Sequence, residues 1–236
     1  MPSRTDAARL RAEQLGVRAL IEGELAEMFA SLDLSRPEMA AAFLRDYVPA
    51  LVSRYGEAAA TVAADWYDEV RAAERIPGRF AALLAPSPYQ DAAEGLARRA
   101  AGALFTPTPQ DALATLMSSA GKYALGAGRE TIARSVQRDP RAVGWQRIVR
   151  PGACGFCRML AGRGAVYKEA TAHFAAHGGS GRGGGGCNCA AVPSWDRNAP
   201  EVDVTLYRAS QRTTGMTPEQ KAQHNALIRE AIPNYT

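Results

Sequence analysis

The sequence predicts a mainly α-helical protein: an N-terminal helical domain, a small β-containing module, and an extended C-terminal arm with a short helix. Alanine, which has the highest helix propensity, makes up about a fifth of the 236 residues. Residues 4–138 are predicted to form a helical domain, and over residues 5–32 apolar side chains recur at spacings of three, four and seven, as in an amphipathic helix. The four cysteines all follow residue 153. These changes of composition place the predicted domains at residues 1–140, 141–194 and 195–236.

The first two helices are predicted from their apolar stripe and their start signals. Residues 5–32 carry a stripe made of Leu10, Val17, Leu20, Ile21, Leu25, Met28 and Phe29. The second helix starts near Ser35, because Ser35 and Glu38 fit a capping box and Pro37 suits a first turn. Pro49 is expected to kink or end this helix, since proline removes a backbone hydrogen bond.

Proline and glycine separate the remaining helices of this domain. A third helix is predicted over 56–74, and the proline-containing segment 76–88 is predicted as a loop. The fourth helix covers about 90–104. Thr108 is expected to cap a fifth helix, with Asp111 at its third position, that continues to about residue 138.

Charge and hydropathy narrow the range of partners. The net charge of +4 and the pI near 9.0 are compatible with nucleic-acid contact without requiring it. No apolar run approaches the roughly 20 residues of a membrane span, and residues 1–11 lack the apolar region of a secretory signal. No membrane partner and no small-molecule substrate is expected. Six arginines form either a basic face toward DNA or an acidic partner, or a solvated helix face: Arg129, Arg134, Arg138, Arg141, Arg147 and Arg150.

The second domain has short strand candidates around a glycine-rich segment. Residues 145–150, 165–168 and 190–192 are the three strand candidates. Gly178–Gly186 reads as a flexible loop by composition, because a phosphate-binding loop would need Lys-Ser or Lys-Thr where Cys187 stands.

The cysteines form two close pairs, Cys154-x-x-Cys157 and Cys187-x-Cys189, which is the spacing of a metal site. Zinc needs four ligands at tetrahedral angles, so a histidine is an attractive addition to the set. We expect zinc to be held by Cys154, Cys157, His177 and one or both of Cys187 and Cys189, which makes this a zinc-stapled module. Reduced free thiols and a disulfide remain the alternatives, and His173 alone fits a structural role better.

The same region resembles a known family. The order Trp-x-Arg, C-x-x-C, Leu-Ala-Gly-Arg-Gly-x-Val-Tyr, Phe-x-x-His, C-x-C and Pro resembles that of MuF-like minor head proteins of tailed bacteriophages, chiefly those infecting actinobacteria. The matching residues are Trp145, Arg147, Cys154, Cys157, Leu160, Ala161, Gly162, Arg163, Tyr167, Phe174, His177, Cys187, Cys189 and Pro193. In the family the histidine lies closer to the C-x-C pair than here, where the glycine-rich segment intervenes.

The resemblance implies a minor capsid protein that is made in the host cytoplasm and built into the virion, inside the head or near the portal. Its implied partners are the portal protein, the major capsid protein, a second copy of itself, or packaged DNA. Members of the family are often labelled capsid maturation protease, so protease activity is one alternative. A genome-associated DNA-binding protein is another.

The residues argue against an enzyme. A serine protease needs a nucleophile beside a base, yet the chain has three histidines and no Gly-x-Ser-x-Gly turn. His173 and His177 have the i, i+4 spacing of zinc metalloproteases, but phenylalanine occupies the place of the catalytic glutamate. An H-N-H nuclease would need a histidine beside its metal-binding turn, which is missing after Cys157. We therefore expect a structural role with no catalytic residues.

The C-terminal arm is predicted to serve assembly. Residues 202–207 alternate apolar and polar side chains, like a strand that adds to a partner's sheet. Thr217 and Gln220 fit a capping box that opens a helix over 218–231. A helix this short is marginal alone in water, so the arm is expected to become fully ordered against another chain. The alternative is that it folds back on the helical domain.

Overall fold

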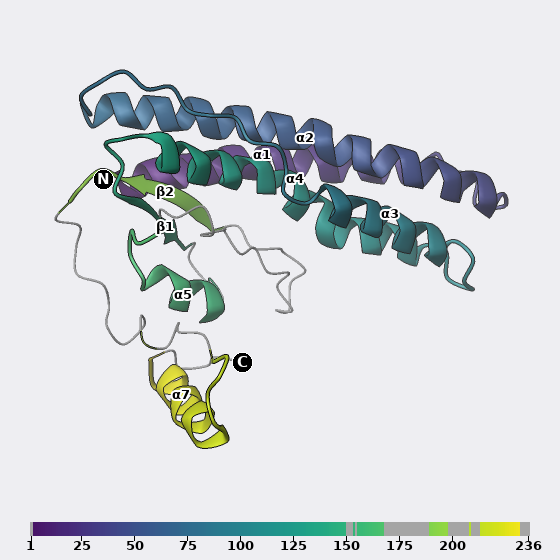
Figure 1. Cartoon of the computed structure of the whole chain (residues 1–236). Coiled ribbons are helices and arrows are strands. Elements are labelled where there is room, and N and C mark those ends of the chain that lie inside the picture. Colours follow the sequence, from purple (N-terminus) through teal and green to yellow (C-terminus); the bar gives the residue numbers. More distant parts are fainter. Residues whose placement is uncertain are drawn as a thin grey trace.

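Four helices pack side by side and form the body of the protein (Figure 1). The computed structural model describes residues 2–149, 153, 155–167, 189–197, 208 and 213–231. The helices are α1 (Arg4–Ala30), α2 (Pro37–Ala73), α3 (Gln90–Ala103) and α4 (Asp111–Arg138). The mainly helical prediction is confirmed. None of the described helices combines the length and the apolar character that crossing a membrane requires.

Helix α1 forms as its apolar stripe predicts. Leu10, Val17 and Ile21 are buried along one side of the helix. At its start, the Ser3 hydroxyl accepts the Asp6 backbone N–H, and the Asp6 carboxylate accepts the Ser3 backbone N–H. This capping box satisfies two donors that an open helix end would leave unpaired.

Pro49 does not end the second helix, because one helix, α2, runs through it for 37 residues. The predicted second and third helices are therefore one element. Leu44, Val48, Leu51 and Val52 flank the proline and are all buried in the core. Their packing outweighs the roughly 3 kcal/mol that an internal proline costs a helix.

Two of the three later capping predictions fail and one holds. Ser35 does not cap α2: its hydroxyl and its backbone N–H both donate to Asp33 in the preceding turn. Thr108 does not cap α4 either, because its hydroxyl donates to the Asp111 side chain and Gln110 is the residue before the helix. The Thr217–Gln220 capping box is present at the start of α7 (Pro218–Ala231).

Small residues let α2 and α4 approach closely. A Cβ on Gly128 of α4 would lie 2.6 Å from the backbone oxygen of Ala59 on α2. A Cβ on Gly56 of α2 would be in ordinary van der Waals contact with Ala127 and Ala124 of α4. Ridges of alanine and glycine therefore take the place of larger side chains at this crossing, which accounts for much of the alanine richness.

Residues 74–89 connect α2 to α3 as an irregular segment, which confirms the predicted loop. Side chains of the neighbouring helices hold its backbone. The backbone N–H of Leu83 donates to the Ser135 hydroxyl, and that of Ala85 donates to the Thr131 hydroxyl. In this way the buried hydroxyls of α4 satisfy backbone donors that cannot pair within a helix or sheet.

A two-stranded antiparallel sheet follows the helical body. Strands β1 (Gly144–Ile148) and β2 (Ala190–Ser194) pair with Gly144 opposite Ser194 and Ile148 opposite Ala190. Of the strand predicted at 165–168, the described residues 165–167 form one bridge, between Tyr167 and Trp145. In Figure 1 the sheet lies between the four-helix body and the short helix α5 (Gly155–Ala161), while α7 lies beyond α5.

One hydrophobic cluster crosses the predicted boundary at residue 140. On the helical side it includes Leu10, Trp66 and Ile132, and on the sheet side Trp145 and Val192. The sheet therefore shares its core with α1, α2 and α4. A second cluster fills the other end of the four-helix body, around residues such as Leu44, Leu96 and Leu116.

Candidate functional site

Two of the predicted zinc ligands are in the described part of the chain, and both lie in the shared core. Cys157 is on α5 and is 1% exposed; Cys189 precedes β2 and is 2% exposed. Both belong to one hydrophobic cluster. Cys154, His177 and Cys187 lie outside the described residues, as do His173 and the glycine-rich segment 178–186.

The alternation of the strands places Arg147, Ala191 and Cys189 on one face of the sheet. Trp145 and Arg147 lie on one face of β1, because side chains two residues apart in a strand share a face. Arg147 pairs with Ala191 across the sheet, so Ala191 has the same orientation. Cys189 comes two residues before Ala191 and continues that alternation. Helix α5, which carries Cys157, packs on β1 from this side (Figure 1).

Arg147 is the unexpected member of this site. Its Nη1 atom lies 3.7 Å from Cys157 Sγ in donor geometry, and its side chain is only 3% exposed. A guanidinium N–H donates to sulfur more strongly when the sulfur is ionised, because charge-assisted hydrogen bonds are the stronger ones. The sequence had grouped Arg147 with surface arginines, whereas the fold makes it a buried neighbour of a thiol.

The predicted basic face needs correction for this reason. Arg129 is 2% exposed and Arg147 is likewise buried, so neither belongs to a solvent-facing surface. Arg134, Arg138 and Arg141 are exposed, and Arg150 lies outside the described residues. A DNA-facing or acidic-partner surface therefore has three described arginines, not a continuous run.

Aromatic packing fixes the chain beside the cysteines. The rings of Trp145 and Tyr167 stack with centroids 4.4 Å apart, and the two backbones exchange N–H···O bonds. The Tyr167 hydroxyl donates to the Leu160 carbonyl of α5. A Cβ on Gly144 would lie 2.1 Å from the Ala165 oxygen, so only glycine allows this approach. These contacts hold residues 165–167, which follow α5, against β1.

A buried carboxylate, Asp139, ties the sheet to the helices. It accepts hydrogen bonds from Arg71 and Tyr67 of α2 and from the Trp195 indole, at 2.9, 3.1 and 2.9 Å. Burial by itself would raise the pKa of Asp139, but hydrogen bonds from Arg71 and Trp195 outweigh it and the pKa is lowered. Burial, aided by the charge of Asp139, raises the pKa of the Tyr67 hydroxyl strongly. Sequence reasoning gave this network no role.

The chemistry of the cysteine site suits a soft metal ion. Thiolate sulfur is a preferred ligand of zinc, and a site closed to water is typical of structural zinc. Among the described residues, no group of three or more His, Cys, Asp or Glu side chains could hold a metal. Cys157 and Cys189 would thus supply two ligands, and the other predicted ligands belong to the undescribed segments.

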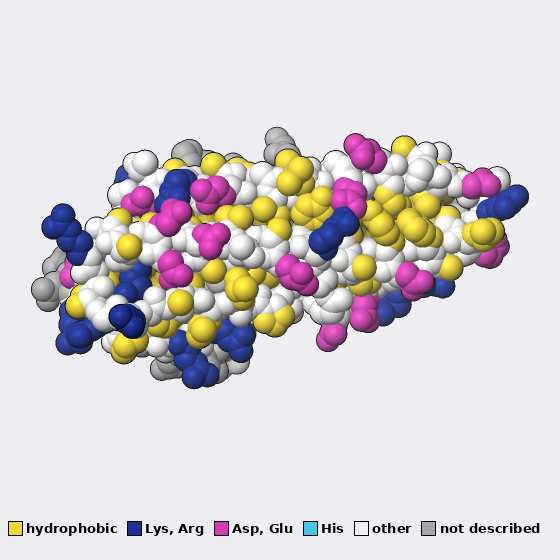
Figure 2. Space-filling view, turned by 90° about the horizontal axis from the view of Figure 1, so that it is seen from above, with side chains coloured by type: hydrophobic (Ala, Val, Ile, Leu, Met, Phe, Trp, Pro, Cys, Tyr) yellow, Lys and Arg dark blue, Asp and Glu magenta, His cyan; other side chains and the backbone are white. Residues whose placement is uncertain are grey.

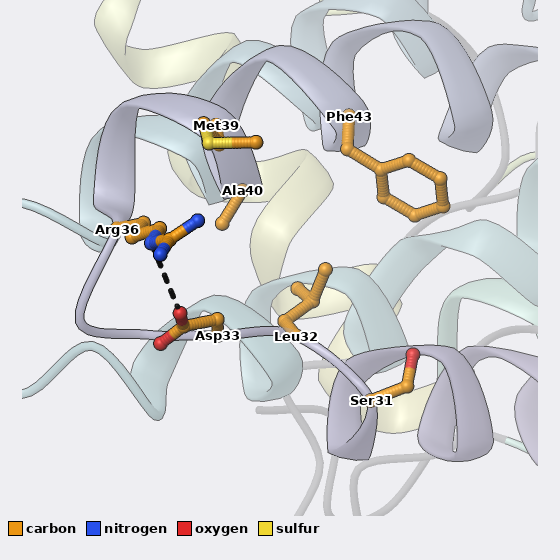
Figure 3. A pocket seen from close by; sticks show the side chains of 7 residues that line it. All are labelled: Ser31, Leu32, Asp33, Arg36, Met39, Ala40 and Phe43. Carbon is orange, nitrogen blue, oxygen red and sulfur yellow. Dashed lines mark ion pairs between the residues drawn. The ribbon is translucent and has the colours of Figure 1, made fainter.

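A pocket lies at the opposite end of the body, at the turn between α1 and α2 (Figure 3). Its lining is Ser31, Leu32, Asp33, Arg36, Met39, Ala40 and Phe43. Asp33 and Arg36 form an ion pair at 3.5 Å, and the Ser31 hydroxyl donates to the Met28 carbonyl. These lining residues include no histidine, cysteine or lysine, and the one carboxylate among them, Asp33, is paired with Arg36. Figure 2 shows apolar side chains gathered in the half of the molecule toward this turn.

Comparison with known proteins assigns the chain to a family. No curated protein and no solved structure shows significant similarity to it. Residues 1–212 match the family described as VG15 protein, a range that covers the four-helix body, the sheet and the cysteine site. The chain therefore belongs to the VG15 protein family.

Proposed function

We propose that this protein is a structural minor head component of a tailed bacteriophage, of the MuF-like kind, that docks on the portal or the capsid shell during assembly. The observation that carries the proposal is the resemblance between residues 145–193 and that family. Of the described motif residues, Trp145, Arg147, Cys157 and Cys189 are buried and residues 160–163 and 167 are partly buried, which suits a motif that packs a core.

Zinc is the second part of the proposal. Bound to Cys157 and Cys189, with the remaining ligands among Cys154, His177 and Cys187, the ion would supply cross-links between α5 and the end of β2. A two-stranded sheet is marginal alone, so such a cross-link would hold the module together during assembly. Two buried cysteines in one hydrophobic cluster are the support for this assignment.

A structural role is favoured over a cysteine protease by the burial of the thiols. A nucleophilic sulfur must reach the carbonyl carbon of a peptide, yet Cys157 and Cys189 are almost completely enclosed. Arg147, which donates to Cys157, cannot act as a general base because a guanidinium stays protonated.

Co-assembly tests this function. The chain would be produced together with the portal protein and major capsid protein of the same genome, and the particles separated on a density gradient. We expect the chain to sediment with assembled shells and to remain at the top of the gradient when it is produced alone. Omitting the portal in a matched preparation identifies which of the two proteins it contacts.

Three results would contradict the proposal. The first is a chain that stays at the top of the gradient although shells and portals have formed. The second is specific cleavage of the major capsid protein that the His177→Ala variant abolishes, which would establish the protease alternative. The third is co-sedimentation that disappears after nuclease treatment of opened particles, which would favour a DNA-binding protein.

A further inference from the structure

We propose that five exposed arginines form one surface that binds the phosphate backbone of a double-stranded nucleic acid. They are Arg75 and Arg79, which follow α2, and Arg134, Arg138 and Arg141, at the end of α4. This contact goes beyond the proposed docking role and does not depend on it, because the portal and the shell are protein. The sequence placed the last three arginines in one group, and the fold adds the first two.

The buried carboxylate of Asp139 brings the two groups of arginines together. It accepts a hydrogen bond from the Arg71 side chain at 2.9 Å and one from the Arg141 backbone N–H at 3.0 Å. The same Arg71 guanidinium donates to the carbonyl oxygen of Gly78, the residue before Arg79, at 2.9 Å. The segment after α2 and the end of α4 therefore meet at one point, with arginines on both sides of it.

All five guanidinium groups are available to a partner. Each side chain is exposed, and none forms an ion pair within the described part of the chain. Arg134 and Arg138 lie one helical turn apart, so they share a face of α4. Figure 2 shows Lys and Arg side chains gathered in the half of the molecule opposite the turn between α1 and α2.

Positive charge exceeds negative charge around this junction. Residues 68–79 and 130–141 carry six arginines and five acidic side chains, but two of the acidic ones, Glu69 and Asp139, form ion pairs with Arg9 and Arg71. Three acidic side chains remain beside the five exposed arginines: Asp68, Glu74 and Glu130. An excess of exposed arginine attracts polyanions, and the paired N–H groups of a guanidinium match the oxygens of a phosphate.

The backbone of Arg75 supports a role for its side chain outside the fold. Arg75 has a φ of 52°, in the left-handed region, at the position just past the end of α2. Glycine is favoured at such a position, because this conformation is unfavourable for residues that have a Cβ. The Arg75 guanidinium makes no ion pair with the described residues that would offset this cost. Binding to a partner gives the side chain a use that the fold does not.

The exposed aromatic side chains lie elsewhere, which favours a duplex over a single strand. Among the described residues they are Phe43, in the first half of α2, and Phe105, after α3, both in the other half of the body. Proteins bind single strands by stacking the bases on aromatic rings, and stable protein interfaces are centred on aromatic anchors. An arginine surface without such rings suits the phosphates that line the outside of a duplex.

The salt dependence of binding tests this surface. Binding of the full chain to fluorescently labelled DNA and RNA duplexes would be measured by anisotropy between about 50 and 200 mM salt. Each neutralised phosphate contributes about −0.9 to the slope of log K against log salt, so we expect a slope of about −3 to −4.5. Two duplexes of unrelated sequence should bind equally, because backbone contacts carry no sequence information. The duplex that binds more tightly, DNA or RNA, identifies the source of the phosphates.

Variants of matched charge locate the contact. Arg138→Gln combined with Arg141→Gln should make the slope less steep by about 2. Arg45→Gln combined with Arg99→Gln removes two exposed charges from the other half of the body and should leave the slope unchanged. Arg75→Gly should make the slope less steep by about 1 without lowering the melting temperature, because glycine suits the left-handed backbone. Circular dichroism checks that each variant keeps its helices.

The surface is disproved if the full chain shows no salt-dependent binding to either duplex, or if the control pair changes the slope as much as the Arg138 and Arg141 pair. Tighter binding to poly-L-glutamate than to a duplex of equal charge would assign the arginines to an acidic protein partner and overturn the proposal. Sedimentation of the chain with shells after nuclease treatment tests docking alone, so the two proposals fail separately.

Discussion

At the scale of single residues, Asp139 is the side chain on which the junction of helices and sheet depends. Replacing it by asparagine would turn an amide N–H₂ toward donors and leave the buried guanidinium of Arg71 without its counter-charge. Removing one partner of a buried ion pair costs about 3–5 kcal/mol. We expect Asp139→Asn to lower the free energy of unfolding in urea by that amount. Asp46→Asn, on the exposed side of α2, should change it by less than about 0.5 kcal/mol.

The same carboxylate predicts how stability depends on pH. The pKa of Asp139 is lower in the folded protein than its ordinary value, near 3.9 in an unfolded chain. Its contribution is therefore fully present above about pH 4 and is lost as the pH falls through the lowered folded value. The unfolding free energy of wild type should drop below pH 4 more steeply than that of Asp139→Asn. Parallel curves for the two proteins would show that Asp139 does not titrate in this way.

Single residues were also where the sequence was least informative about the site. The C-x-x-C and C-x-C spacings identified Cys157 and Cys189 because that spacing is rare. No such spacing singled out Arg147, because an arginine in a basic stretch of sequence is expected to be a surface residue. One signal was available: Trp145 and Arg147 alternate on a strand candidate, which places both on one face. Asp139 had no local signal, because its partners Tyr67 and Trp195 are far away in the chain.

At the scale of elements, glycine-to-alanine substitution should have opposite effects at two positions, one at the crossing of α2 and α4 and one in α1. Gly128→Ala gains up to about 1 kcal/mol of helix propensity but puts a Cβ against the Ala59 carbonyl, and such overpacking costs about 1–3 kcal/mol. Gly16→Ala in α1 meets no atom within 4 Å and should simply stabilise. We expect the melting temperature to fall for Gly128→Ala and to rise for Gly16→Ala. A rise in both would mean that the crossing can relax.

Helix positions were predictable from the sequence, whereas their ends and their continuity were not. Apolar spacing located α1, α3 and α4 because burial of one face depends on that spacing alone. The continuity of α2 through Pro49 depends on what packs against it, which no local pattern contains. Ser35 and Thr108 failed as caps for a related reason: Asp33 and Asp111 compete for their hydroxyl groups.

At the scale of the whole molecule, the four-helix body and the cysteine site share one hydrophobic core, so we expect them to unfold together. The cluster that holds Cys157 and Cys189 also holds Trp66 and Ile132, so the sheet packs directly on the helices. The sequence could not indicate this, because the change of composition near residue 140 looks like a domain boundary. Substitutions at the cysteine site should therefore also destabilise α1, α2 and α4.

Trp195 is the last described residue along the chain that belongs to the cluster shared by the sheet and the helices, and it sets the last prediction. Its indole N–H donates to Asp139 and its ring meets Tyr67 edge-on with centroids 5.4 Å apart, so it belongs to the body although it follows β2.

A chain that ends at Arg197 should keep the unfolding free energy of its body. A chain that ends at Ser194 should lose about 3–5 kcal/mol, the cost of deleting a buried tryptophan. Urea unfolding followed by circular dichroism compares the two truncations, which differ by three residues. Equal stabilities would mean that the tryptophan contributes nothing to the core. If the longer fragment proves stable but no longer sediments with shells, residues 198–236 are the docking arm that the sequence predicts.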